Sequence, residues 1–177
     1  GTSLVEARLA GMDAIGTDIN PTARMIAKAK TTDYNLKRLN RCVHSFLKSM
    51  EDNLHSMTDY SAFPEPQYVT WERLQDWFPV RSISEISFAL KKIAEIDYKR
   101  AQLFLRVALS ECLRLVSFQR NGEFKLYRIP AEERDEYYVP LLSKLRDRVQ
   151  RNLTGLEQYS VAVPRVTKVK ICDFNTV

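Results

Sequence analysis

The sequence predicts an α/β protein in which a partial, doubly wound parallel sheet is interrupted by a large, mainly helical insertion. Residues 1–32 carry a helix–strand–acid pattern, and residues 33–163 show mostly helical periodicity. A single alternating strand pattern returns in residues 164–177. Helices that alternate with apolar strands are typical of parallel sheets. We therefore expect residues 1–32 and 164–177 to form one α/β core, with residues 33–163 inserted between them.

The first segment has the pattern of a glycine turn, a helix, a strand and an acidic residue. Thr2 and Ser3 are good N-cap residues, and Glu6 occupies the position of a capping-box acid. Gly11 is expected to end the helix. Residues 12–17 are a short, largely apolar run, which is typical of a parallel strand buried on both faces.

Asp18 lies at the tip of this predicted strand. In nucleotide-binding α/β folds, an acid about 20 residues beyond the glycines accepts hydrogen bonds from ribose hydroxyls. Alternatively, Asp18 is only the N-cap of the next helix, whose first turn suits Pro21. Asn20 can fill that capping role as well, which would leave Asp18 free for a ligand. The spacing alone leaves both interpretations open.

The insertion is predicted to consist of helices joined by loops. Helical patterns cover residues 22–30, 34–57 and 85–95, the last of these starting at Ser84. Asp97 is expected to cap a helix that runs to about Phe118, and a last helix runs from about Tyr137 or Val139 to Leu153. Residues 124–129 alternate like a short strand after the turn signal Asn121-Gly122. Residues 166–172 also alternate as a strand, which ends at Asp173.

Residues 58–79 form a loop-rich crossing, because Pro64, Pro66 and Pro79 forbid a continuous helix. The segment also contains the aromatic residues Trp71, Trp77 and Phe78. Such side chains can stack on an unpaired base. We expect them instead to anchor the loop on the core.

Composition excludes several classes of protein. The chain of 177 residues is 45% hydrophobic and 28% charged, as in ordinary globular proteins. No apolar run approaches the about 18 residues that cross a bilayer. Cys42, Cys112 and Cys172 are widely spaced and form no metal-binding pattern with His44 and His55. We expect buried or incidental thiols in a reducing cytoplasm, and no metal site.

The excess of positive charge is concentrated in two regions, and the formal net charge is +5. Residues 24–48 contain only Asp33 as an acid, beside the basic residues Arg24, Lys28, Lys30, Lys37, Arg38, Arg41 and Lys48. A second basic region covers residues 144–170. Such patches favour polyanions through phosphate neutralisation. Alternatively, these basic residues only form solvent-exposed helix faces. The composition does not distinguish this interpretation from polyanion binding.

The opening segment resembles the S-adenosylmethionine-binding region of the amino-group DNA methyltransferases. Residues 1–7 (GTSLVEA) are similar to the end of the first motif of that family, and residues 16–21 (GTDINP) to its second motif. The likeness is close over residues 1–32. It is diffuse in the insertion, where it rests on Trp77-Phe78, Ile86, Leu90, residues 104–117 and residues 124–128.

This resemblance implies a Rossmann-like methyltransferase sheet and a site-specific enzyme of the restriction-modification type. Such an enzyme transfers a methyl group from S-adenosylmethionine to an exocyclic amino group of adenine or cytosine in DNA. The resemblance makes Gly1 the last glycine of the cofactor turn, with Thr2 beside it. It makes Asp18 the ribose-binding acid and places Ile19, the next residue, among the cofactor-binding residues. Asp173 matches a third acidic position that contacts the cofactor, although Cys172 replaces the usual glycine and a plain strand-end turn stays an alternative.

The catalytic motif of this family, Asp/Asn/Ser-Pro-Pro-Tyr/Phe, is missing from the sequence, and residues 64–68 (PEPQY) lack its adjacent prolines. We therefore assign no catalytic residue. We expect an internal fragment that is inactive alone, within a cytoplasmic enzyme that acts on DNA and contacts no membrane. Two alternatives stay open. One is a non-catalytic, basic helical module that binds DNA or protein and keeps a degenerate cofactor half-site. The other is methylation of RNA or a protein.

Overall fold

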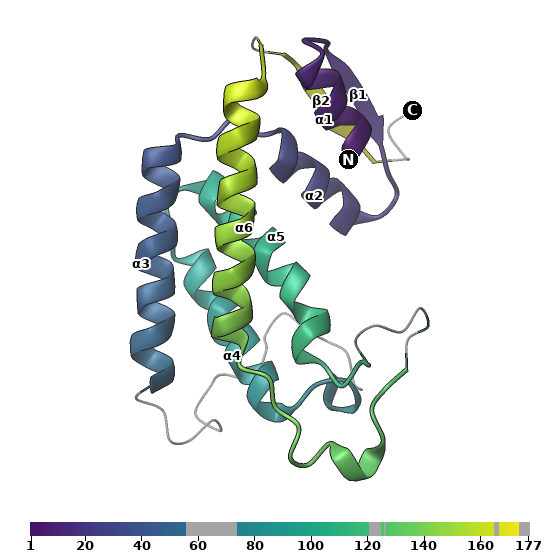
Figure 1. Cartoon of the computed structure of the whole chain (residues 1–177), viewed down its shortest axis with the longest axis vertical. Coiled ribbons are helices and arrows are strands. Elements are labelled where there is room, and N and C mark those ends of the chain that lie inside the picture. The colour runs from purple at the N-terminus through teal and green to yellow at the C-terminus, as the bar shows by residue number, and fades with distance from the viewer. Residues whose placement is uncertain (56–73, 121–124, 126, 165–166, 174–177) are drawn as a thin grey trace.

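A computed structural model of the chain describes residues 1–55, 74–120, 125, 127–164 and 167–173 (Figure 1). These residues are mostly helical, with a small parallel sheet. The longer elements are α1 (Thr2–Leu9), β1 (Ala14–Thr17), α2 (Pro21–Thr31), α3 (Leu36–His55), α4 (Val80–Ala94), α5 (Lys99–Leu113), α6 (Leu141–Ala162) and β2 (Val169–Cys172). Short 3₁₀ helices cover Leu74–Asp76, Arg114–Val116 and Ala131–Glu133.

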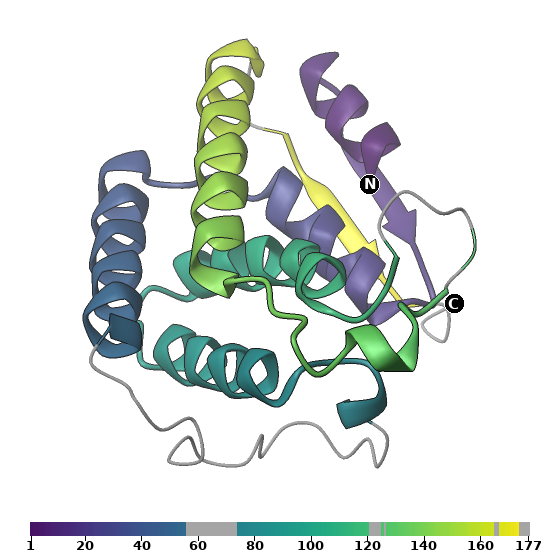
Figure 2. The same ribbon diagram turned by 60° about the horizontal axis from the view of Figure 1, so that its bottom comes forward.

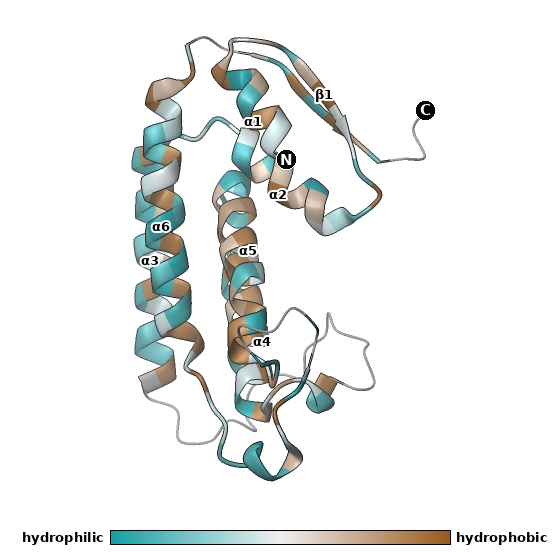
Figure 3. Cartoon of the chain, turned by 45° about the vertical axis from the view of Figure 1, so that its right-hand side comes forward, coloured by the Kyte–Doolittle hydropathy of each residue, from teal (hydrophilic) through white to brown (hydrophobic). Residues whose placement is uncertain are grey.

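The sheet joins the two ends of the described chain. β1 pairs with β2 in parallel, so that Ala14 lies opposite Val169 and Thr17 lies opposite Cys172. Helices α1 and α2 pack on one face of these strands (Figure 3). Gly16 permits the close approach of α1, because a Cβ at this position would lie 3.0 Å from the Leu4 Cδ1 atom. The predicted pairing of an N-terminal and a C-terminal segment in one α/β unit is thus observed, whereas the proposed domain boundaries stay a prediction.

The prediction that residues 12–17 are buried on both faces is wrong for the described chain. Ile15 is 74% exposed and Met12 is 54% exposed. Burial alternates along β1, so Ala14 and Gly16 face the helices while Ile15 and Thr17 face away from them. An apolar run is typical of a fully covered strand, but only the helix-facing side is covered by described residues.

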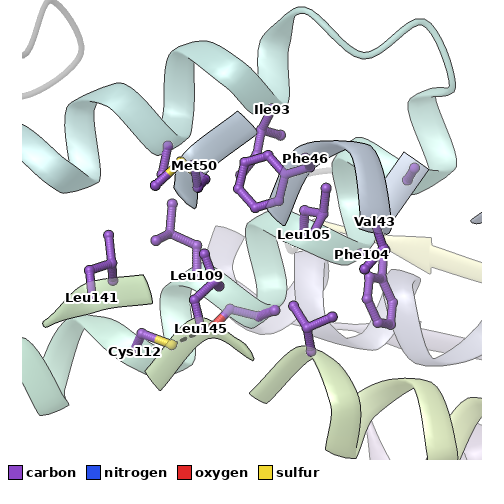
Figure 4. Close-up of a cluster of buried hydrophobic side chains, with 14 of the residues drawn as sticks. Val43, Phe46, Met50, Ile93, Phe104, Leu105, Leu109, Cys112, Leu141 and Leu145 are labelled. Atoms are coloured by element: carbon purple, nitrogen blue, oxygen red, sulfur yellow. Dashed lines mark hydrogen bonds between the residues drawn. The ribbon is translucent and has the colours of Figure 1, made fainter. Parts of the chain in front are cut away.

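The main core lies among helices α3, α4, α5 and α6 (Figure 4). Helix α5 runs through its centre and contacts α2, α3, α4 and α6 (Figure 2). The periodicity of the predicted helix over residues 34–57 is confirmed by α3, because Leu39, Val43, Phe46 and Met50 are all buried. Burying such side chains contributes about 1.5–3 kcal/mol each, before the entropy of folding is subtracted.

Several helix ends differ from the sequence prediction. Helix α4 begins at Val80 rather than near Ser84, whose hydroxyl instead donates to the Val80 carbonyl inside the helix. Helix α6 ends at Ala162, nine residues beyond the predicted end at Leu153, and passes through Gly155. Because Leu156 in this extension packs against the core, tertiary contacts outweigh the poor helix propensity of glycine.

The first and fifth helices also begin differently from the prediction. Gly1 is the N-cap of α1 and provides no side-chain cap, so the expected capping by Thr2 or Ser3 is wrong. The N-cap of α5 is Tyr98 rather than Asp97. In contrast, Gly11 follows α1 with a φ of 70°, a conformation that favours glycine after a helix, as predicted.

A buried carboxylate ties α4 to the start of α6. Glu85 is 1% exposed and accepts hydrogen bonds from the Tyr138 hydroxyl and from the Leu141 backbone N–H, the latter at 3.1 Å. The Arg81 guanidinium lies 3.3 Å from the same carboxylate. Leu141 is the first residue of α6, so Glu85 supplies from another helix the cap that Pro140 cannot.

Part of the loop-rich crossing is described. Phe78 packs against the core, as expected. The Arg128 guanidinium lies over the Trp77 ring, 5.1 Å from the ring centre. Of the predicted strand over residues 124–129, only residues 125 and 127–129 are described, and Arg128 among them forms an isolated antiparallel bridge with Gln119. The turn at Asn121-Gly122, Trp71 and the proline-containing residues 64–68 lie outside the described residues.

Candidate cofactor-binding site

The candidate site lies at the carboxyl edge of the sheet, where the arrowheads of β1 and β2 point in the same direction (Figure 2). Asp18 follows β1 and Asp173 follows β2, directly beyond the paired residues Thr17 and Cys172. The Asp18 N–H donates to the Cys172 carbonyl at 3.3 Å, which extends the ladder by one bond. The two acids are therefore brought to one edge, where ligands of open α/β sheets bind.

The loop after β1 settles which residue caps α2. The Asn20 side chain accepts hydrogen bonds from the backbone N–H groups of Thr22 at 2.8 Å and Ala23 at 3.4 Å. Asn20 is therefore the N-cap, and Asp18 is not. The Asp18 Oδ1 atom accepts from the Asn20 N–H at 2.8 Å, whereas its Oδ2 atom has no hydrogen-bond partner in the described part of the chain. Asp18 as a residue is exposed.

An arginine that the sequence interpretation did not single out as a site residue holds this loop. One Nη atom of Arg24 donates to the carbonyl oxygens of Asp18 at 2.7 Å and of Ile19 at 3.0 Å. Arg24 lies in the first turn of α2, close to the loop that precedes the helix. Its guanidinium fixes the backbone that carries Asp18 and Ile19. The sequence contained a usable signal, because an arginine at the fourth position of a helix can reach the carbonyls before its N-cap.

The start of α1 approaches the same edge. Because α1 runs antiparallel to β1, its N-terminus lies toward the end of the strand at which Asp18 is found (Figure 1). Gly1 and Thr2 are exposed there. A Cβ at Gly1 would lie 3.6 Å from the Ala27 Cβ atom, an ordinary contact. The packing of α2 therefore does not require a glycine at this position.

A buried arginine holds α1 against the rest of the molecule. Arg8 is 2% exposed, and its guanidinium donates to the Thr167 hydroxyl at 2.9 Å, to Asp33 Oδ1 at 2.6 Å and to the Thr31 carbonyl. It also lies 5.7 Å from the centre of the Tyr159 ring. The sequence interpretation described α1 by its apolar residues and missed Arg8, although Arg8 lies one turn after Leu4 and so shares its buried face.

The remaining candidate residues differ in exposure. Ile19 is 78% exposed and offers an apolar surface beside Asp18, while Asp173 is half-buried. Among the described residues, no group of acidic, histidine and cysteine side chains could hold a metal ion. His44 is exposed, whereas the side chain of His55 lies outside the described residues. No helix within the described ranges is long and apolar enough to cross a membrane.

The three cysteines are free thiols, as expected. Cys112 is fully buried and its Sγ atom lies 3.3 Å from the Ala108 carbonyl. Burial raises the pKa of the Cys112 thiol to about 11. Cys112 is therefore protonated at neutral pH and is not a nucleophile, because the thiolate is the reactive form. Burial likewise raises the pKa of Tyr159, which the Arg8 guanidinium partly offsets.

Two acids and the start of a helix thus lie at the carboxyl edge of the two parallel strands. Comparison with known proteins then gives a methyltransferase as a relative. The chain is 33% identical over 157 residues to the type II methyltransferase M.MvaI of Kocuria varians. The alignment covers 88% of this chain, so it includes most of the helical region. It confirms the resemblance to the DNA methyltransferases.

The chain spans about a third of the length of that relative, namely 34%. No family model matches the sequence. No solved structure matches it either.

Proposed function

We propose that this chain is part of an S-adenosylmethionine-dependent, site-specific DNA methyltransferase that modifies an exocyclic amino group of adenine or cytosine. The intact protein would be cytoplasmic and would belong to a restriction-modification system. The observation that carries the proposal is the meeting of Asp18, Asp173 and the start of α1 at one sheet edge. The similarity to a type II methyltransferase over 88% of the chain supports it.

The groups at this edge suit the chemistry of the proposed cofactor. The Asp18 carboxylate keeps one oxygen without a partner in the described part of the chain, and a ribose presents two hydroxyl donors. Exposed Ile19 supplies an apolar surface next to that carboxylate, suited to the face of an adenine ring. Gly1 leaves space that a side chain would occupy, although no neighbour in α2 requires it.

In this proposal each residue has a defined role. Asp18 accepts hydrogen bonds from the ribose hydroxyls, and Arg24 positions it by holding the loop backbone. Gly1 and Thr2 allow the methionine end to approach the start of α1, where free N–H groups attract a carboxylate. Asp173 contacts the adenine or the adjoining methionine part. When bound, S-adenosylmethionine supplies the electrophilic methyl group.

Transfer itself requires groups that this sequence lacks. The family motif Asp/Asn/Ser-Pro-Pro-Tyr/Phe holds the target amine and stacks a flipped base, and no such string occurs among the 177 residues. We therefore propose that these residues bind and orient the cofactor, and that the catalytic motif belongs to another part of the intact protein. The Rossmann-like character of the complete sheet is part of the same proposal.

The direct test is transfer of radioactive methyl groups from S-adenosylmethionine to unmodified DNA by the full-length protein. After digestion of the DNA, we expect the label in N6-methyladenine or N4-methylcytosine. Label in C5-methylcytosine would contradict the amino-group assignment. Label in RNA or protein substrates alone would contradict DNA as the acceptor. DNA binding without any transfer would favour the alternative of a non-catalytic binding module.

A further inference from the structure

Helix α3 carries a row of basic side chains along its solvent-exposed face. Lys37, Arg41 and Lys48 are all exposed and follow one another at four and seven residues. At 100° per residue these positions lie within about 40° of one another around the helix. At 1.5 Å per residue the row is about 16 Å long. We call Lys37, Arg41 and Lys48 the α3 basic row.

The α3 basic row has no ion pair with an acidic residue in the described part of the chain, in contrast to the basic residues that neighbour acids elsewhere on the surface. Glu51, which follows the row on α3, is matched by Arg146 at 2.7 Å. No described ion pair therefore neutralises the row, and the exposed Asp52, one turn beyond Lys48 on the same face, marks its end.

The position of the row on α3 opposes helix stability. Lys37 and Arg38 lie in the first turn of α3, and that turn contains no acidic residue. Unpaired N–H groups already make a helix N-terminus positive, so basic side chains there destabilise the helix. The same positive charge attracts anions. Lys28 and Lys30 lie in the last turn of α2, where cations stabilise a helix. The helix dipole therefore explains the lysines of α2 but not those of α3.

The shape of the surface also exposes this row. Helix α3 lies along one side of the molecule (Figure 1). A groove separates it from α4 and is lined by Arg38, Arg41 and Lys92 together with the acid Glu95. A second groove separates it from α6, and its charged lining is mixed: His44, Lys48 and Arg146 with Glu51, Asp52 and Asp147. The face of α3 that carries the row thus stands between two hollows.

We propose that the α3 basic row binds the sugar-phosphate backbone of double-stranded DNA; this rests on the proposed function and names the surface that positions its substrate. A row about 16 Å long is equal to about five base-pair rises of 3.4 Å measured along the duplex axis. A protruding helix suits the wide major groove of B-form DNA, and the narrow groove of A-form RNA does not admit it. The row fixes orientation and reads no sequence, because lysine and arginine contacts to phosphate are independent of sequence.

The test measures duplex DNA binding by the full-length protein as a function of salt. Lys37→Gln/Arg41→Gln removes two charges from the row, and Lys28→Gln/Lys30→Gln removes the same charge from α2 as a matched control. Each lost phosphate contact lowers the slope of log affinity against log salt by about 0.9. We expect the α3 variant to lose about 2 from this slope and, from the same relation, about 60-fold in affinity at 0.1 M salt. The control should keep both values.

Three results would overturn the proposal. They are equal losses in the two variants, an unchanged slope in the α3 variant, and a loss confined to duplex RNA. Thermal melting separates binding from folding, because Lys37→Gln removes an unfavourable charge and should not lower the melting temperature. Methyl transfer at saturating DNA is measured on the same variants. Absence of transfer in the unmodified protein counts against the proposed function, whereas the salt slopes judge the α3 basic row independently.

Discussion

Replacing the buried Arg8 tests how the α/β unit is held against the helices. Arg8→Met keeps an apolar stem but removes the guanidinium, which leaves the Thr167 hydroxyl and the Thr31 carbonyl without their donor. Each buried polar group left unsatisfied costs about 1–3 kcal/mol. The side chain of Asp33 is 67% exposed, so the ion pair itself adds only about 0–1 kcal/mol. We expect Arg8→Met to lower the free energy of unfolding by about 3 kcal/mol.

The matched variant is Asp33→Asn, which removes the ion pair and leaves the Arg8 bonds to Thr167 and Thr31 in place. It should cost less than about 1 kcal/mol. Urea unfolding followed by circular dichroism gives both values, and melting should show a loss of about 6–12 °C for Arg8→Met. Equal costs for the two variants, or a cost below about 0.5 kcal/mol for Arg8→Met, would refute this reasoning.

Three further predictions follow from the packing and the site. Glu85→Ala leaves the Leu141 N–H and the start of α6 uncapped, so unfolding in urea should show a loss of about 2–4 kcal/mol; a loss below about 1 kcal/mol would contradict the cap. The Cys112 pKa is raised from 9.0 to about 11 by burial, so its stabilising contribution is complete below about pH 9 and is lost toward pH 11. Urea midpoints measured across this pH range should therefore fall more steeply for the unmodified protein than for Cys112→Ala. Parallel curves would contradict the raised pKa of Cys112. Arg24→Ala removes the two hydrogen bonds that hold the loop carrying Asp18, a net loss of about 1–1.5 kcal/mol. Calorimetry should therefore show S-adenosylmethionine binding weakened about ten-fold. Unchanged affinity would remove Arg24 from the site.

The features that the sequence predicted correctly depend on local chemistry. Asn20 caps α2 through its own side chain, and Gly11 adopts the positive φ that ends a helix without strain. The apolar spacing of α3 predicted its buried face, because helix geometry alone determines which residues share a face. The parallel pairing of β1 with β2 joins distant segments, and its prediction rested on the helix–strand alternation and on the family resemblance rather than on local chemistry.

The features that the sequence did not predict depend on distant partners. Arg8 is buried because Thr167, Thr31 and Asp33 surround its guanidinium, and the last of these lies 25 residues away in sequence. Glu85 caps a helix that begins 56 residues later. The true end of α6 depends on packing beyond Gly155. No periodicity or propensity within a short window contains such information.

The candidate site divides in the same way. Asp18 and Asp173 follow from a motif resemblance, and the parallel register of the sheet brings them to one edge. Arg24 entered the sequence interpretation only as one of several basic residues. Its role in holding the carbonyls of Asp18 and Ile19 depends on how the loop folds back over the first turn of α2.

The most direct test of the central claim is calorimetric titration of S-adenosylmethionine into the full-length protein and its Asp18→Ala variant. Two hydrogen bonds from ribose hydroxyls to a carboxylate predict a loss of about 100-fold in affinity. Asp13→Ala is the matched control, because Asp13 lies at the opposite end of β1 and accepts from the Lys168 N–H at 2.8 Å. We expect the control to bind as the unmodified protein does. Equal affinity of Asp18→Ala and the unmodified protein would contradict a cofactor site at this edge of the sheet.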